Sequence, residues 1–217
     1  MKIKWIEIFK ILEDFQTGYD LPSVSLIGNE EGSPFKILIS TLISLRTRDE
    51  VTLEASRRLF ESADTAEAMM KLSQEEIEAL IYPCGFFRVK SGNILTISKE
   101  IVQNLGGQVP SSKEGLLALP GVGLKTANLV LSLGFAIPAI CVDIHVHRIA
   151  NRMGWVKTNK PDDSVPALEK ILPREYWIPI NELLVLFGQQ ICTPRSPKCS
   201  QCPLHEHCRR CGVEQSR

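Results

Sequence analysis

An all-α fold of two packed helical domains is predicted by three features of this 217-residue sequence. Apolar residues recur at the three-to-four spacing of one helix face, first at Trp5, Ile8, Phe9 and Leu12 and again at Ile94, Ile97, Ile101 and Leu105. The alternation of apolar and polar residues that indicates β-strands is hard to find in any sustained form. Serine-x-x-glutamate signals for helix starts pair Ser73 with Glu76 and Ser111 with Glu114.

The composition is that of an ordinary globular protein. Hydrophobic residues make up 44% and charged residues 23% of the chain, which excludes the disordered and fibrous classes. Charged residues interrupt the stretch from Met1 to Asp20, which leaves no apolar run for a signal peptide or a membrane span. We therefore expect a cytoplasmic monomer with no membrane partner, associated with the nucleoid if the chain is prokaryotic. A nuclear or mitochondrial location is also compatible with the sequence.

Charge is unevenly distributed along the chain. The formal net charge is +0, whereas nucleic-acid-binding proteins are often strongly basic. Residues 125–160, however, contain one acid, Asp143, against five basic residues, namely Lys125, Arg148, Arg152, Lys157 and Lys160. We expect one face of the protein to be basic enough to contact phosphate while another stays in water.

A glycine-containing turn between two short helical segments is the first candidate site. Residues 112–135 read SKEGLLALPGVGLKTANLVLSLGF, with Gly121, Val122 and Gly123 between a short helix and an apolar helix that starts near Leu124. Glycines adopt positive φ and let backbone N–H groups approach a bulky partner. Such a turn at a helix N-terminus suits a phosphate oxygen. An ordinary connection between two helices is the alternative interpretation.

Four of the seven cysteines form the second candidate site. Cys192, Cys199, Cys202 and Cys208 have the spacing C-x6-C-x2-C-x5-C. Without an export signal, disulfides explain this spacing poorly. Four thiolates can hold an iron–sulfur cluster or zinc, and the spacing alone leaves both open. Cys211 competes with Cys208 for the last position.

Several motifs together resemble a known family. The segment LPGVGLKTA is similar to the hairpin of the endonuclease III branch of the helix-hairpin-helix DNA glycosylases. The similarity continues in order and spacing through CGFFRVKSGNI, GGQVP, VDIHVHRIANR, ELLVLFGQQIC and the cysteine cluster. It covers most of the chain, from about Pro34 to Cys208.

The resemblance implies a domain organisation and a cofactor. It predicts a six-helix barrel over residues 23–137 that ends in the helix-hairpin-helix motif. Residues 1–22 and 138–217 would form a discontinuous domain with a 4Fe-4S cluster. The family spacing assigns the four ligands to Cys192, Cys199, Cys202 and Cys208, and thereby prefers Cys208 to Cys211.

Lys125 and Asp143 match the catalytic residues of the family. Lys125 lies near the second position of the helix after the hairpin, where the helix dipole disfavours a protonated amine. In the family the matching lysine attacks the anomeric carbon, expels the damaged base and forms a Schiff base that permits β-elimination. Asp143 would stabilise the positive charge on the sugar. The simpler alternatives are a phosphate-contacting lysine and a helix N-cap, and the N-cap is compatible with catalysis.

Other DNA contacts are predicted with their alternatives. Arg46 stands where the family carries a glutamine that fills the gap left by the flipped base, so it reads a different base edge. Phe86 falls where the family places an apolar wedge, although a core position suits a phenylalanine equally. Arg195 and Lys198, in the cysteine loop, are either phosphate contacts or solvated cations.

The expected function is base excision repair of double-stranded DNA that contains damaged bases or abasic sites. We expect a bifunctional glycosylase and abasic-site lyase that removes oxidised pyrimidines through a Schiff base on Lys125. Because of Arg46, a glycosylase for thymine or uracil opposite guanine is the alternative. A non-catalytic DNA-binding hairpin protein and a ferredoxin-like electron carrier are the alternatives from other classes.

Overall fold

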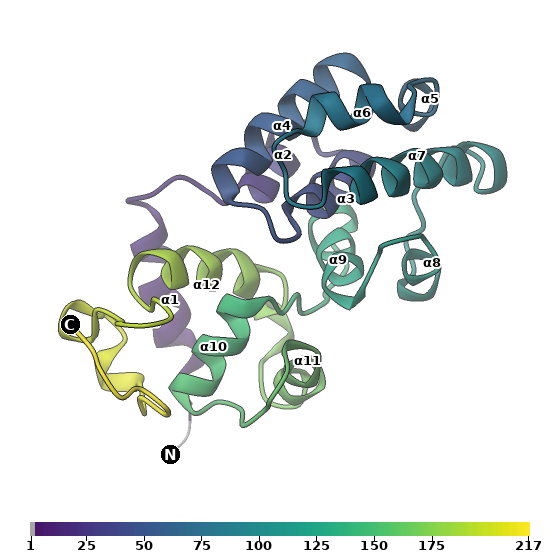
Figure 1. The fold of residues 1–217 in the computed structure, drawn as a ribbon. Helices are drawn as coiled ribbons and strands as arrows, with labels where there is room; N and C mark the ends of the chain where they lie inside the picture. The colour runs from purple at the N-terminus through teal and green to yellow at the C-terminus, as the bar shows by residue number, and fades with distance from the viewer. Residues whose placement is uncertain (1–2) are drawn as a thin grey trace. The chain divides into compact units, whose positions relative to one another are not determined.

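The computed structural model describes residues 3–217, apart from the side chain of Glu31, and contains helices and loops without a β-strand in that range (Figure 1). The all-α prediction is thereby confirmed. The chain divides into two compact units. One is Ser23–Ile137, and the other combines the residues up to Pro22 with Pro138–Arg217.

The unit Ser23–Ile137 is built around one buried helix. Its helices are α2 (Ser23–Glu31), α3 (Pro34–Ser44), α4 (Asp49–Ser62), α5 (Ala66–Met69), α6 (Gln74–Ile81), α7 (Phe87–Asn104), α8 (Lys113–Leu117) and α9 (Leu124–Leu129), which continues as a π-helix over Val130–Gly134. Helix α3 is buried on all sides and packs against α2, α4, α7 and α9. A helix that is buried on every face belongs in the interior, so α3 forms the core of this unit.

Of the two capping signals predicted in this unit, one marks a helix start as expected and the other is shifted by one residue. The Ser73 hydroxyl accepts from the backbone N–H of Glu76 while the Glu76 carboxylate accepts from that of Ser73, as the sequence predicts. The predicted start at Ser111 is wrong by one residue, because Ser112 caps α8 through the N–H of Gly115. Either serine can cap, because both offer a hydroxyl at the start of the same segment, and in the structure the cap is Ser112.

The other unit is formed by the two ends of the chain. It contains α1 (Trp5–Gln16), α10 (Ile144–Met153), α11 (Pro161–Glu169), α12 (Pro179–Gln190) and the 3-10 turns Arg174–Tyr176, Cys199–Gln201 and His205–His207. Helix α1 packs on α12, which also packs on α10 (Figure 1). Phe9 of α1 stacks on Tyr176 with ring centroids 4.0 Å apart, and Trp5 meets Trp155 edge-on at 4.9 Å. Aromatic contacts therefore join segments that lie far apart in the sequence.

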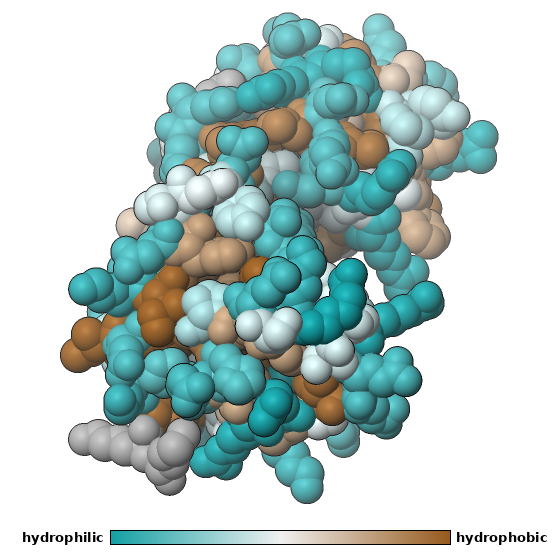
Figure 2. Space-filling view, turned by 90° about the vertical axis from the view of Figure 1, so that its left-hand side faces the viewer, coloured by the Kyte–Doolittle hydropathy of each residue, from teal (hydrophilic) through white to brown (hydrophobic). Residues whose placement is uncertain are grey.

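One face of the molecule is mainly hydrophilic. In the view of Figure 2, hydrophilic side chains cover most of the visible face, and hydrophobic ones form small separate patches. Exposed apolar side chains include Tyr82, Phe86 and Val89, which lie close together in the sequence. None of the helices within residues 3–217 combines the length and the apolar character needed to cross a membrane.

Candidate nucleic-acid interface and iron–sulfur site

The turn between α8 and α9 exposes backbone at two glycines. Gly121 has φ +75°, a backbone conformation that favours glycine, and a Cβ atom there would also displace the end of the Asn93 side chain. Gly123 has φ −100° and ψ −179°, so the expected positive φ is found only at Gly121. A Cβ on Gly123 would meet open space, because the backbone there is uncovered. Between them, Val122 is buried and anchors the turn to the unit.

Lys125 is the second residue of α9, as the sequence predicts. Its side chain is half-buried, whereas Thr126 and Ala127 beside it are buried. The first helical turn of α9, which follows the exposed glycines, therefore carries the Lys125 amine at a defined position. Backbone N–H groups at such a terminus attract anions, so the same place can hold a phosphate beside the amine.

Asp143 is the N-cap of α10. Its Oδ1 atom accepts hydrogen bonds from the backbone N–H groups of His145, at 2.8 Å, and Val146, at 2.9 Å. These two bonds fix the carboxylate at the start of the helix, which agrees with the N-cap interpretation of the sequence. Asp143 belongs to the unit formed by the chain ends, and Lys125 to the unit Ser23–Ile137.

Arg46 and Phe86 come together from two different loops. The guanidinium carbon of Arg46 lies 5.3 Å from the centroid of the Phe86 ring, within the range of a cation–π contact. Both side chains are exposed, Phe86 by 61%. Their φ values are 54° and 59°, a region that costs free energy for residues other than glycine. The two DNA-contact candidates that the sequence treats separately thus form one exposed pair.

Lys90 holds the loop beneath this pair, and sequence reasoning missed it. Its Nζ donates to the carbonyl oxygens of Ile43 and Leu45, each at 2.6 Å, and to Thr47 Oγ1 at 2.9 Å. The residue is 6% exposed, and burial lowers its pKa to about 8. The sequence does contain a signal for the burial of Lys90. Lys90 stands four residues before Ile94, and this spacing places both residues on the buried face of α7.

The four predicted cysteine ligands line one cavity. Cys192 follows the end of α12, Cys199 begins a 3-10 turn that ends before Cys202, and Cys208 follows the last such turn. Cys211 is exposed and does not line the cavity, which supports the preference for Cys208. The remaining two cysteines, Cys84 and Cys141, are buried, as expected for inert thiols.

The electrostatics of this cavity suit a cationic occupant. Burial, reinforced by neighbouring thiols, raises the pKa of Cys202 to about 11 and also raises that of Cys208. Thiolates crowded in this way need a positive charge among them. Four sulfur donors spread around one cavity fit a 4Fe-4S cluster, in which each thiolate binds a different iron atom.

Two arginines of α10 hold the loop that begins at Cys192. Arg152 donates to the Cys192 Sγ at 3.4 Å and to the carbonyl oxygens of Thr193 and Pro194 at 2.7 and 2.6 Å. Arg148 donates to the carbonyl oxygens of Cys192 and Gly188, both at 3.0 Å. Arg148 and Arg152 are four residues apart, which places them on one face of α10, where they can contact the same loop. In the sequence they count only as two of the basic residues of the segment 125–160.

The two cations predicted in the cysteine loop differ from each other. Arg195 is exposed, as expected for either a phosphate contact or a solvated residue. Lys198 is half-buried and lines the cysteine cavity next to Cys199. Its exposure is therefore lower than the sequence suggests, because the chain folds back there and the Lys198 N–H donates to the Ile191 carbonyl oxygen.

Comparisons with known proteins agree with this arrangement. Residues 39–174 match the model of the HhH-GPD superfamily of base excision DNA repair proteins, and residues 192–208 match the iron–sulfur binding domain of endonuclease III. The chain is 50% identical to endonuclease III of Thermotoga maritima over 83% of this chain and 84% of that protein. It is 36% identical to endonuclease III of Bacillus subtilis, over 82% of this chain and 81% of that protein.

Solved structures are similar as well. A trapped covalent intermediate of endonuclease III with DNA has a TM-score of 0.77 and 35% identity, and covers 82% of this chain and 84% of that one. A thermostable thymine-DNA glycosylase has a TM-score of 0.73 and 24% identity, over 93% of this chain and 97% of that one. The second similarity concerns the fold alone.

Proposed function

Because the chain belongs to the endonuclease III family of DNA glycosylases with abasic-site lyase activity, we propose that Lys125 is its nucleophile and that oxidised pyrimidines are its substrates. The observation that carries this proposal is the position of Lys125 in the first turn of α9, directly after the exposed turn at Gly121 and Gly123. An amine at that place meets the sugar of a nucleotide whose phosphate is bound by the turn.

The reaction follows from a lysine nucleophile. The Nζ lone pair of Lys125 attacks C1′ of the flipped nucleotide, the bond from C1′ to the base breaks, and the base leaves with that electron pair and takes up a proton. Ring opening then converts the adduct to an imine. Loss of a proton from C2′ breaks the C3′–O bond and nicks the strand, and water hydrolyses the imine to free Lys125.

Asp143 has a supporting role in this proposal. As base departure begins, positive charge develops on the sugar, and a carboxylate held at a fixed position stabilises it. The N-cap bonds to His145 and Val146 use Oδ1 and keep the carboxylate in one orientation. The same residue therefore caps α10 and supports the chemistry, as the sequence allows.

DNA is held by several groups in this proposal. Backbone N–H groups around Gly121 and Gly123 bind a phosphate, and Arg195 and Lys198 contribute positive charge at the cysteine loop. Arg46 and Phe86 enter the space left by the flipped nucleotide. Because these groups, Lys125 and Asp143 all belong to one chain, we propose that a monomer acts on each lesion.

The cofactor of the chain is a 4Fe-4S cluster, and we assign its ligands to Cys192, Cys199, Cys202 and Cys208. When bound, the cluster cross-links the loop after α12 and neutralises its thiolates. Arg152, through its bond to the Cys192 Sγ, keeps the loop in a conformation ready to hold it. No step of the reaction with DNA requires electron transfer through these residues.

The substrate is tested by a panel of duplexes. One group carries thymine glycol, dihydrouracil and hydroxyuracil, and the other carries thymine or uracil opposite guanine. We expect faster base release from the oxidised group and borohydride trapping of the protein on it. Arg46 keeps the mismatch substrates as a second candidate, because its five donors read a base edge differently from a glutamine. Release of mismatched thymine without release of thymine glycol would establish the second candidate.

A further inference from the structure

Lys90 is a buried cation whose three donors are all used by the C-terminal end of α3 and the loop that follows it. An ammonium group has three donors, and the three acceptors are the carbonyl oxygens of Ile43 and Leu45 and the hydroxyl of Thr47. The two carbonyl groups lie at the C-terminal end of α3, where the last carbonyls lack partners within the helix and where the dipole favours a cation. Lys90 thus acts as a C-terminal cap supplied by α7.

The acceptors lie on both sides of Arg46. Leu45 precedes Arg46 and Thr47 follows it, so the ammonium group fixes the backbone on either side of the exposed guanidinium. Arg46 itself has φ 54°, and its carbonyl oxygen is so close to Gly85 that a Cβ on Gly85 would lie 2.5 Å away. The loop conformation that exposes Arg46 therefore depends on contacts with Lys90 and Gly85.

Thr47 links the Arg46 loop to the residue before Phe86. Its Oγ1 accepts from Lys90 Nζ at 2.9 Å and from the backbone N–H of Gly85 at 3.2 Å. The next residue is Phe86, with φ 59° and its ring beside Arg46. One hydroxyl and one ammonium group thereby connect the two loops that carry the exposed pair.

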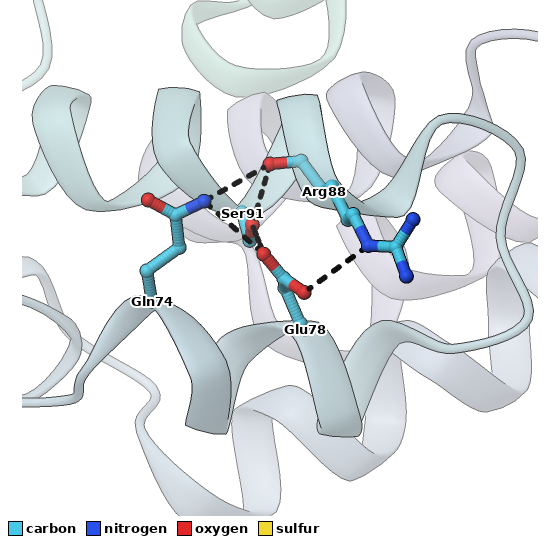
Figure 3. Close-up of polar contacts among 4 residues, drawn as sticks. All are labelled: Gln74, Glu78, Arg88 and Ser91. Atoms are coloured by element: carbon cyan, nitrogen blue, oxygen red, sulfur yellow. Dashed lines mark hydrogen bonds and ion pairs between the residues drawn. The ribbon is translucent and has the colours of Figure 1, made fainter.

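The first turn of α7, which follows Phe86, is also fixed from α6. Figure 3 shows Gln74 and Glu78 pointing from α6 towards this turn. Gln74 Nε2 donates to Glu78 Oε1 at 3.1 Å and to the Arg88 carbonyl oxygen at 3.3 Å, and Ser91 Oγ donates to the same carbonyl at 2.8 Å. Arg88 Nε lies 3.9 Å from Glu78 Oε2. The Phe86 carbonyl oxygen accepts from the backbone N–H groups of Val89 and Lys90, each at 3.0 Å, so this fixed first turn also holds Phe86.

We propose that Lys90 is a positioning residue that holds Arg46 and Phe86 as one preassembled pair for insertion into duplex DNA opposite a flipped nucleotide. This inference rests on the proposed function. A pair that is already ordered loses little conformational freedom on binding, which favours insertion. Because Lys90 fixes where the donors of Arg46 point, it also determines which base opposite the lesion is preferred.

The test compares Lys90→Met with Lys99→Met in the full holoprotein. Methionine fills similar space without donors, and Lys99 is an exposed residue of the same helix. For Lys90→Met we expect base release from a thymine glycol duplex to fall roughly tenfold, as loss of hydrogen bonds to a charged group predicts. Differences in kcat/KM among the four opposite bases should shrink. Borohydride trapping on a single-stranded abasic oligonucleotide, where no base pair must open, should match that of Lys99→Met.

Combination with Arg46→Ala separates positioning from general stability. If Lys90 acts through the pair, Lys90→Met has little further effect on duplex substrates once Arg46 is alanine. Equal fold losses in both backgrounds would overturn the proposal. Thr47→Val, which leaves the ammonium group two carbonyl acceptors, provides a milder variant if Lys90→Met fails to fold. Thr47→Val should also reduce the differences in kcat/KM among the four opposite bases, as Lys90→Met does.

The outcomes also distinguish the two proposals. A wild-type protein that neither releases an oxidised base nor becomes trapped on DNA contradicts the proposed function itself. A wild-type protein that does both, with Lys90→Met and Thr47→Val indistinguishable from Lys99→Met on every duplex, contradicts only the role of Lys90.

Discussion

The loop that carries Arg46 and the loop that begins at Cys192 are both held by cations from a neighbouring helix, yet their stability has different sources. Lys90 completes the first loop with three hydrogen bonds from within the polypeptide. Arg152 bonds the carbonyl oxygens of the second loop and also a cysteine sulfur, while the thiols beside it repel one another once ionised. The first loop is therefore organised by the fold alone, whereas the second depends on its cofactor.

The largest effect is expected from the cysteines themselves. Replacement of Cys192, Cys199, Cys202 or Cys208 by serine should lose or destabilise the cluster, because a structural site rarely tolerates loss of a ligand. Cys211→Ser should keep about four iron atoms per chain, as a four-cysteine ligand set predicts. Iron content and visible absorbance measure both outcomes. Bleaching by Cys211→Ser but not by Cys208→Ser would show that the ligand assignment is wrong.

A smaller effect on the same loop is expected from Arg152. Arg152→Met removes the bonds to the Cys192 Sγ and to two carbonyl groups, so the cluster should be lost to a chelator about tenfold faster, in line with a hydrogen bond to a charged group. Lys170→Met, at an exposed position of the same unit, is the control. Equal rates of cluster loss in the two variants would show that the arginine does not hold the loop.

The conformation of the Arg46 loop should depend on pH, through the charge of Lys90, and not on the iron content of the protein. Burial lowers the pKa of Lys90 to about 8, so the ammonium is charged below that pH and is lost as the pH rises through it. Burial raises the pKa of the facing thiol of Cys84, and the other charged group beside that thiol is Arg58, which donates to the Leu80 and Tyr82 carbonyl oxygens.

The ratio of wild-type to Lys90→Met base release on duplex DNA should therefore fall as the pH is raised. We expect a decrease of about threefold between roughly pH 7 and pH 9, since a neutral amine keeps only two of its three donors. The ratio cancels any pH dependence of the reaction that the two proteins share. A ratio that stays constant over this range contradicts a role for the charge of Lys90.

The sequence predicts features that depend on neighbouring residues, and it does not predict contacts between segments that are distant in the chain. The capping box at Ser73, the N-cap at Asp143 and the start of α9 at Leu124 depend on neighbouring residues and are confirmed. The bonds of Lys90 to the α3 loop and the contact of Arg46 with Phe86 join distant segments, and such contacts leave no periodic pattern in the sequence. At the start of α8 two adjacent serines offer the same local signal, so the sequence could not decide which of them caps the helix.

Borohydride trapping of Lys125 variants tests whether Lys125 is the nucleophile. A lysine nucleophile forms an imine that borohydride reduces to a stable bond, whereas a glycosylase that activates water does not. The wild-type protein should be trapped on a duplex with an intact oxidised base. Lys125→Gln should abolish trapping and slow base release by at least about a thousandfold, while affinity for undamaged duplex is retained through the backbone at Gly121 and Gly123. Continued trapping of Lys125→Gln on the intact damaged base would show that another amine is the nucleophile.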